Sequence, residues 1–268
     1  MPAALLWLTH STNKMPKYAD IAHGVADVMR AANGKKKYKP TSAVIVAAGG
    51  STRMGGIDKQ FMPVCGIPVL AHTVKSFEDC PAIGEIIIVT RAESVEKITE
   101  LCREHGFLKV KEIVIGGADR QESVWNGFSK IDDRSEFVAI HDGARCLITP
   151  EQIEKIVLEA YRCGAATAAT RATDTVKIAE KGAYISDTCD RNKVWLAQTP
   201  QVFGTNLYRA AAYTATEAKF KATDDCMLAE RIKYNSIALV DCGKYNLKIT
   251  TPDDIAVVEA LLSARKKD

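Results

Sequence analysis

The stretch from Ala47 to Gln60 combines glycines and basic side chains directly after an apolar run. It reads AAGGSTRMGGIDKQ and follows SAVIV. Glycines let backbone N–H groups approach an anion closely, and Arg53 and Lys59 add two positive charges that can bind separate phosphates. The stretch therefore predicts a site for a phosphorylated ligand. The alternative is an ordinary glycine-rich turn with exposed basic side chains.

Two common phosphate-binding motifs are absent from this stretch. A P-loop ends in Gly-Lys-Ser or Gly-Lys-Thr, whereas the turn here ends Gly55-Gly56-Ile57. The dinucleotide fingerprint G-x-G-x-x-G has no matching register in the stretch. The sequence therefore favours neither a P-loop NTPase nor an NAD-binding domain.

Three further segments place glycine or charge where a strand is expected to end. GGADRQESV (116–124) follows an apolar run and then opens a helix, HDGARC (141–146) contains Asp142 and Arg145, and YNLKITTPDD contains Lys248. A carboxylate beside phosphate-binding cations is the kind of ligand that Mg²⁺ requires. Asp142 is therefore a candidate metal ligand, although an aspartate that caps a tight turn would look the same.

Apolar runs and helical patterns alternate from Ser42 onward. The runs expected to form short buried strands are 42–48, 85–90, 111–117, 137–143, 164–170 and 236–241. Helical patterns lie between them, for example at 94–105 and 150–164. This alternation predicts an α/β fold whose mostly parallel sheet is flanked by helices. Because ligands bind beyond the carboxyl ends of the strands in such a sheet, we expect the charged segments to meet there.

The pattern changes between about Arg171 and Gln198. Residues there alternate as in strands, and Glu180-Lys-Gly182 is a turn signal. We therefore expect a projecting hairpin, a β-arm over about 171–193, instead of a crossover helix. Helical patterns resume at 205–218 and 224–233, and a last helix follows the cap at Thr251–Asp254.

The composition is that of an ordinary soluble protein, with 47% hydrophobic and 26% charged residues. Residues 1–40 have a charge balance of +5, which leaves −2 for the rest of a chain whose formal net charge is +3. That remainder does not indicate a nucleic-acid surface. The 8 cysteines include no pair at zinc-site spacing, so we expect free thiols in a reducing cytoplasm.

Residues 1–40 are interpreted as an N-terminal extension of unknown role that precedes a single domain at 41–268. The apolar run Ala3–Leu8 is too short to span a bilayer, and no basic residues precede it as in a secretory signal. The basic stretch Gly34–Pro40 is either a recognition patch or a solvated linker. We expect neither a membrane nor a nucleic-acid partner.

The ordered motifs resemble those of the 2-C-methyl-D-erythritol 4-phosphate cytidylyltransferases over roughly Ser42 to Leu262. They are AAGGSTRMG, DKQF, GGADRQESV, HDGAR, ATDTVK, DRNKVWLAQTPQ, TDD and YNLKITTPDD. The resemblance implies a Rossmann-like nucleotidyltransferase fold. It also implies transfer of CMP from CTP to 2-C-methyl-D-erythritol 4-phosphate, with release of pyrophosphate, in the non-mevalonate isoprenoid precursor pathway. Mg²⁺ is the implied cofactor, and CTP and a polyol phosphate are the implied substrates.

The resemblance further implies roles for the matching positions. The cations that stabilise the reacting phosphates match Arg53, Lys59 and Lys248. The positions that hold the nucleotide match Ala48, Gly49, Gly116, Gly117, Ser123 and Asp142, the last of these near the metal. The acceptor side matches Arg145, Thr175 and Arg191. Because family members extend their arm to the partner subunit's site, the resemblance implies a homodimer.

One position departs from the family pattern, and two other functions stay open. Cys146 replaces the usual proline after HDGAR, which loosens the exit of that turn. A substrate phosphate that is already ionised needs no general base, so His141 is expected to pack or to bond within its turn. The alternatives are a ribitol-5-phosphate cytidylyltransferase and a nucleotide-sensing module without turnover.

Overall fold

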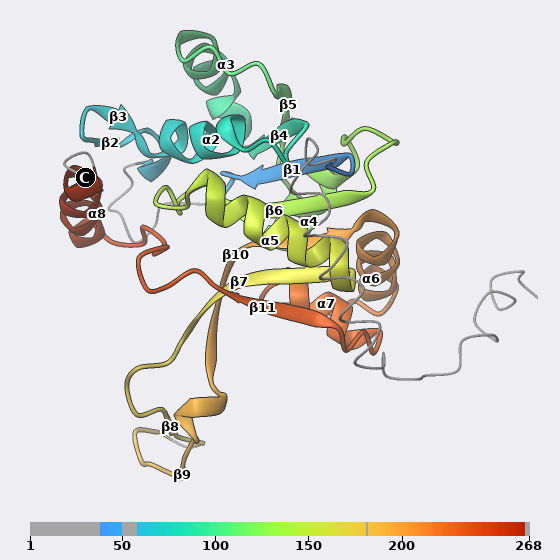
Figure 1. The fold of residues 1–268 in the computed structure, drawn as a ribbon, viewed down its shortest axis with the longest axis vertical. Helices are drawn as coiled ribbons and strands as arrows, with labels where there is room; N and C mark the ends of the chain where they lie inside the picture. Colours follow the sequence, from blue (N-terminus) through green and yellow to red (C-terminus); the bar gives the residue numbers. More distant parts are fainter. Residues whose placement is uncertain (1–37, 50–57, 181, 266–268) are drawn as a thin grey trace, which may run out of the picture. The chain divides into compact units, whose positions relative to one another are not determined.

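The computed structural model describes residues 38–49, 58–180 and 182–265 (Figure 1). Its main sheet is built from β1 (Thr41–Val46), β4 (Glu85–Thr90), β5 (Val110–Ile115), β6 (Phe137–Asp142), β7 (Ala165–Arg171), β10 (Trp195–Gly204) and β11 (Ile237–Asp241). The seven strands lie in the order β11-β7-β10-β6-β1-β4-β5. Every pairing is parallel except the two that β10 makes. The predicted mostly parallel sheet is confirmed.

The helices cover both faces of this sheet (Figure 1). They are α2 (Val69–Asp79), α3 (Val95–Glu104), α4 (Arg120–Phe128), α5 (Pro150–Cys163), α6 (Thr205–Glu217) and α7 (Asp225–Arg231), whereas α8 (Asp253–Arg265) packs in a separate apolar cluster with Val64 of β2. Short 3-10 turns lie at η4 (Lys59–Phe61), η5 (Ala92–Ser94) and η6 (Arg191–Lys193), and β2 (Pro63–Val64) pairs with β3 (Ile67–Pro68).

The alternation of side chains along β1 explains the two layers of helices. Ala43 and Ile45 join the buried cluster that includes α2, α3 and α5. Val44 points to the other face and joins the cluster formed with α4, α6 and α7. Because successive residues of a strand face opposite sides, a strand that is apolar throughout must be covered on both.

The loops after the central parallel strands meet at one edge of the sheet. Gly143, after β6, donates its backbone N–H to the carbonyl of Val46 at 2.9 Å. Gly116, after β5, donates to the carbonyl of Thr90 at 2.8 Å. Because β1 also pairs with β4, the carboxyl ends of β1, β4, β5 and β6 are held together, which places the predicted ligand-binding segments side by side.

Strand β10 is the element that the sequence patterns did not place. It lies antiparallel between β6 and β7, with Gln201 opposite both Ile140 and Thr167. The alternating stretch that we expected to belong wholly to a hairpin continues through the sheet to Gly204. The local sequence of a strand that pairs on both edges does not indicate which strands it pairs with.

The β-arm projects from the sheet between β7 and β10 (Figure 1). Its stem is closed by a hydrogen bond from the Ala172 N–H to the Val194 carbonyl at 3.1 Å. Its end holds β8 (Lys177–Ile178) paired antiparallel with β9 (Asp187–Thr188). Gly182 lies between them at a φ of +62°, a left-handed conformation that glycine adopts without strain. The arm expected from the alternation is therefore present.

The residues from Tyr38 onward belong to one compact unit. Tyr38 donates its hydroxyl to Glu154 Oε1 at 2.6 Å, so this unit includes residues just before Thr41. The rest of the expected N-terminal extension lies outside the described residues. In the described part of the chain, no helix has both the length and the apolar character needed to cross a membrane.

Candidate active site

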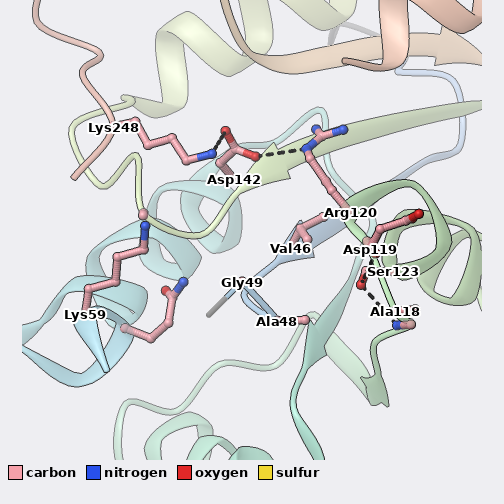
Figure 2. Close-up of a pocket in the computed structure, with 13 residues that line it drawn as sticks. Val46, Ala48, Gly49, Lys59, Ala118, Asp119, Arg120, Ser123, Asp142 and Lys248 are labelled. Carbon is pink, nitrogen blue, oxygen red and sulfur yellow. Dashed lines mark hydrogen bonds and ion pairs between the residues drawn. The ribbon is translucent and has the colours of Figure 1, made fainter. Parts of the chain in front are cut away.

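A cavity of about 350 Å³ opens at the carboxyl ends of β1 and β6, beside the N-terminus of α4 (Figure 2). The predicted site residues that line it are Ala48, Gly49, Lys59, Gly117, Ser123, Asp142 and Lys248. They come from four separate segments of the chain. The convergence expected from the strand ends is therefore present in one cavity.

Asp142 lies at the centre of the charged groups of the cavity. Lys248 Nζ approaches its Oδ2 at 3.0 Å, and Arg120 Nε approaches its Oδ1 at 3.5 Å from the other side (Figure 2). Arg145 Nε lies 3.4 Å from Oδ2. Burial alone would raise the pKa of Asp142, but the attraction of Lys248, Arg120 and Arg145 outweighs it and lowers that pKa. Asp142 is therefore a carboxylate at neutral pH, although its side chain is only 10% exposed.

Lys59 and Lys248 are tied to the same short segment of chain. Lys59 Nζ donates to the carbonyl of Ile249 at 2.9 Å. The Ile249 N–H in turn donates to the carbonyl of Ala144 at 2.9 Å, which fixes the segment beside the loop after β6. Both ammonium groups are therefore positioned at the cavity by a segment of backbone that is itself held in place. Arg53, the third predicted cation, lies outside the described residues.

The loop before α4 is built from the glycines that the sequence predicted. Gly117 and Ser123 line the cavity, and the Gly117 N–H donates to Ser123 Oγ at 3.1 Å. Gly116 does not line it. A Cβ on Gly116 would lie 2.6 Å from Ala48 Cβ, so the glycine lets the loops after β1 and β5 touch. Its contribution is close packing between two cavity walls.

Arg145, predicted to lie on the acceptor side, is held by contacts within its own chain. Its side chain is only 14% exposed and does not line the cavity. Nη1 donates to the carbonyl of Asn246 at 2.8 Å, while Nε faces Asp142. Within this chain Arg145 joins the loop after β6 to the segment that carries Lys248, and its role as a substrate-side cation stays a prediction.

His141 and Cys146 flank this loop on its buried side. His141 Nδ1 lies 3.1 Å from Thr199 Oγ1, and its Nε2 lies 3.2 Å from the carbonyl of Arg145. Burial lowers the pKa of His141 to about 3, so the ring is neutral, and the expected bonding within the turn is confirmed. Cys146 packs in an apolar cluster with Val64 and Ile249, and burial raises the pKa of its thiol to about 12.

The two predicted residues of the arm are not brought to this cavity by their own chain. Thr175 and Arg191 are both exposed, and neither lines the cavity. Arg191 Nη1 donates to the carbonyl of Thr173 at 3.0 Å, within the stem of the arm.

Six cavity residues were not assigned from the sequence, and Arg120 and Gln60 are the two whose side chains matter most for binding an anion or a metal ion. Arg120 lies inside the quoted motif GGADRQESV, and its charge was the available signal. Gln60 is 3% exposed, and its Oε1 has no hydrogen-bond partner among the described residues. Only its position after Lys59 in DKQF could have pointed to it, and a glutamine there carries no distinctive chemistry.

Comparisons with known proteins agree with this geometry. A family model described as 2-C-methyl-D-erythritol 4-phosphate cytidylyltransferase matches residues 41–264. A curated protein of that description from Caldanaerobacter subterraneus subsp. tengcongensis is 44% identical over 227 residues, which cover 82% of this chain and 98% of that protein. Another from Chlorobium luteolum is 37% identical over 234 residues, covering 83% and 98%.

Solved structures agree as well. The 4-diphosphocytidyl-2C-methyl-D-erythritol synthase from Anaerococcus prevotii superposes with a TM-score of 0.76 at 31% identity, covering 84% of this chain and 96% of that one. The 2-C-methyl-D-erythritol 4-phosphate cytidylyltransferase from Thermus thermophilus gives a TM-score of 0.69 at 29% identity, covering 83% and 98%. The fold is therefore shared with enzymes that bear these names.

Proposed function

The chain belongs to the 2-C-methyl-D-erythritol 4-phosphate cytidylyltransferase family, and we propose that the cavity between β1, β6 and α4 is where its reaction takes place. The reaction transfers CMP from CTP to 2-C-methyl-D-erythritol 4-phosphate. Its products are 4-diphosphocytidyl-2-C-methyl-D-erythritol, an intermediate on the way to isoprenoid precursors, and pyrophosphate. The observation that carries the placement is the convergence of Lys59, Lys248 and Arg120 on one cavity.

The main obstacle in this reaction is repulsion between two anions. The phosphate of the acceptor must attack the α-phosphorus of CTP in line, and both partners carry negative charge. Cations held in advance offset that charge and stabilise the transition state without reorganising during the reaction. Lys59 and Lys248 are proposed to supply this charge, together with Arg53 from the stretch that the sequence singled out.

The nucleotide is proposed to lie between the loop after β1 and the loop before α4. Gly49 and Gly117 leave backbone groups accessible on the two walls, and both line the cavity. Close approach of Ala48 to Gly116 narrows the space between these walls. Such a slot suits a flat pyrimidine ring whose edge is recognised by backbone groups and by Ser123.

A divalent metal ion, proposed to be Mg²⁺, fits the oxygen donors of this cavity. In the described residues no group of three or more His, Cys, Asp or Glu side chains could hold an ion. Asp142 offers an ionised carboxylate on the cavity wall, and the buried Oε1 of Gln60 is an oxygen acceptor without a partner among the described residues. Mg²⁺ commonly takes one or two protein oxygens and completes its shell with phosphate and water. When bound, such an ion neutralises charge on the triphosphate.

The acceptor is proposed to bind partly through the arm of a second subunit. Arg145, the third residue predicted on the acceptor side, donates to the Asn246 carbonyl within its own chain, and the arm is proposed to supply a further cation for the acceptor phosphate. Arg191 and Thr175 lie on an arm that projects from the sheet and are exposed. Tyr184 and Ile185 on the same arm are 84% and 65% exposed, as expected of a segment that packs against another chain. A homodimer would place each arm at its partner's cavity.

A reducing cytoplasm is the proposed setting. All eight cysteines lie in the described residues and are free thiols. Free buried thiols are typical of cytosolic proteins.

The proposed function is tested by turnover with a panel of acceptors. The purified protein is incubated with CTP and Mg²⁺ and with 2-C-methyl-D-erythritol 4-phosphate or ribitol 5-phosphate, and pyrophosphate release is followed. Release is expected with the first acceptor and should require CTP in preference to ATP, GTP or UTP. CTP binding without release from any acceptor would refute the assignment in favour of a nucleotide sensor. Faster release with ribitol 5-phosphate would refute the acceptor.

A further inference from the structure

The sequence motif TDD (Thr223–Asp225) ends in a carboxylate that is almost completely buried. Asp225 lies in the first turn of α7, and its side chain is 1% exposed. Its backbone N–H donates to Gln201 Oε1 at 2.8 Å, so the middle of the sheet fixes its position. Tyr208, itself buried, donates its hydroxyl to Oδ1 of Asp225 at 3.4 Å. The carboxylate is therefore held rigidly by two elements distant in sequence.

The partner of this buried carboxylate is a residue of the proposed active site. Arg120 Nη2 donates to Asp225 Oδ2 at 2.7 Å. The same guanidinium uses Nε to approach Asp142 at 3.5 Å. Arg120 thus spans two carboxylates, one inside the protein and one on the cavity wall.

The guanidinium keeps donor capacity on the side of the cavity. The Arg120 side chain is 31% exposed and lines the cavity. Nε and Nη2 make the contacts of Arg120 with the two carboxylates, and Nη1 makes no hydrogen bond with any described residue. Attraction to Asp225 and Asp142 outweighs burial and raises the pKa of Arg120, so the charge is permanent. A guanidinium pinned at two of its nitrogens can present the third in a fixed direction.

We propose that Arg120 is a further phosphate-binding residue of the CTP site and that Asp225 is the positioning residue that aims it. This inference rests on the proposed function, because it takes the triphosphate as the ligand of the cavity. Asp225 does not touch the cavity and acts only through Arg120. Gln201 and Tyr208 act one step further back, by fixing Asp225.

Two physical roles of Asp225 predict opposite effects on CTP. If Asp225 merely neutralised Arg120, its removal would make the cavity more positive, and CTP would bind more tightly. If Asp225 aims Arg120, its removal frees the guanidinium to turn toward Asp142, and CTP binds more weakly. The sign of the change therefore separates positioning from neutralisation.

The test is the affinity of the full chain for CTP and for cytidine, measured by titration in wild type and in Asp225→Asn. CTP affinity is expected to fall about tenfold, the loss that follows when one charge-assisted hydrogen bond is misaligned. Cytidine affinity is expected to change less than about twofold. The matched control is Asp224→Asn, since Asp224 caps α7 through the Met227 N–H and also accepts from Gln201 but does not contact Arg120. Asp224→Asn should leave the ratio of the affinity for CTP to the affinity for cytidine unchanged.

Three results would overturn the inference: tighter CTP binding, unchanged CTP binding, or equal losses for CTP and cytidine. If Asp225→Asn does not fold, Arg120→Lys decides the question. A lysine keeps the charge but cannot span both carboxylates and face the cavity, so the same selective loss of CTP affinity is expected. Wild-type protein that binds CTP without turning it over would refute the proposed reaction and leave this inference standing.

Discussion

Replacing Lys248 by methionine removes one cation from the cavity and leaves a side chain of similar length. Lys248 Nζ lies 3.0 Å from Asp142 Oδ2, and its side chain is 36% exposed. Arg145 and Arg120 remain within 3.4 and 3.5 Å of the same carboxylate. Asp142 is therefore not left as an unpaired buried charge in the variant.

The effects on stability and on catalysis should differ in size. A partly exposed ion pair contributes about 0–1 kcal/mol to the free energy of unfolding, and two arginines still compensate Asp142 in the variant. A preorganised cation at the reacting phosphates contributes about 3–4 kcal/mol to the transition state, which corresponds to 10²–10³ in kcat. We therefore expect Lys248→Met to fold normally and to lose nearly all turnover.

The assay is pyrophosphate release at saturating CTP and acceptor, paired with urea unfolding of the same preparations. Lys244→Met is the matched control, because it removes the same charge from the same segment. Lys244 is exposed, its Nζ lies 5.3 Å from the ring centre of Tyr245, and it does not line the cavity. Its turnover should stay within about twofold of wild type, since an exposed charge that does not line the cavity is screened by water and salt.

The reasoning fails if Lys248→Met keeps kcat within threefold of wild type. It fails equally if Lys244→Met loses as much activity. The loss would then be due to the overall positive charge of the segment and not to a cation at one position beside the phosphates. A loss of several kcal/mol in the free energy of unfolding would mean that Lys248 holds the loop together instead of acting on phosphate.

Three other predictions concern the arm, the packing of α4 and the free energy of unfolding at acidic pH. Arg191→Ala should raise KM for the acceptor at least tenfold while CTP affinity stays constant; a change in CTP affinity alone would contradict its assignment. Gly127→Ala should lower the free energy of unfolding by about 1–2 kcal/mol, because the new Cβ would lie 2.5 Å from Val89 Cγ2 and 2.6 Å from Val44 Cγ1; a higher urea midpoint would show that the helix has room. His141 is neutral in the native state with its pKa lowered to about 3, whereas the unfolded state takes up a proton below its ordinary value of 6.5. The contribution of the neutral ring to the free energy of unfolding is therefore complete above pH 6.5. It is lost as the pH falls toward 3, by up to about 1.4 kcal/mol per pH unit. In His141→Gln the unfolding free energy should fall less steeply between pH 6.5 and 5, and an identical slope would argue against a buried neutral ring.

The location of the site could be predicted from the sequence because it depends on local patterns. Apolar runs that alternate with helical stretches force a parallel sheet, and parallel strands end at one edge. Lys59, Asp142 and Lys248 follow such strands or precede a helix, so their convergence needed no knowledge of distant contacts. The same logic failed for β10, because strand order depends on which strands pair across the chain.

The pairing of charges is what only the tertiary structure decided. Arg145 and Arg120 are both arginines in motifs at strand ends, yet one is held inside its loop and the other lines the cavity. The difference arises from partners far along the chain, Asn246 for the first and Asp225 for the second. A sequence gives the charge of a side chain and its distance from the nearest strand end. The direction in which that charge points is set by buried partners, whose desolvation makes their contacts strong and whose positions follow from the packing of the whole domain.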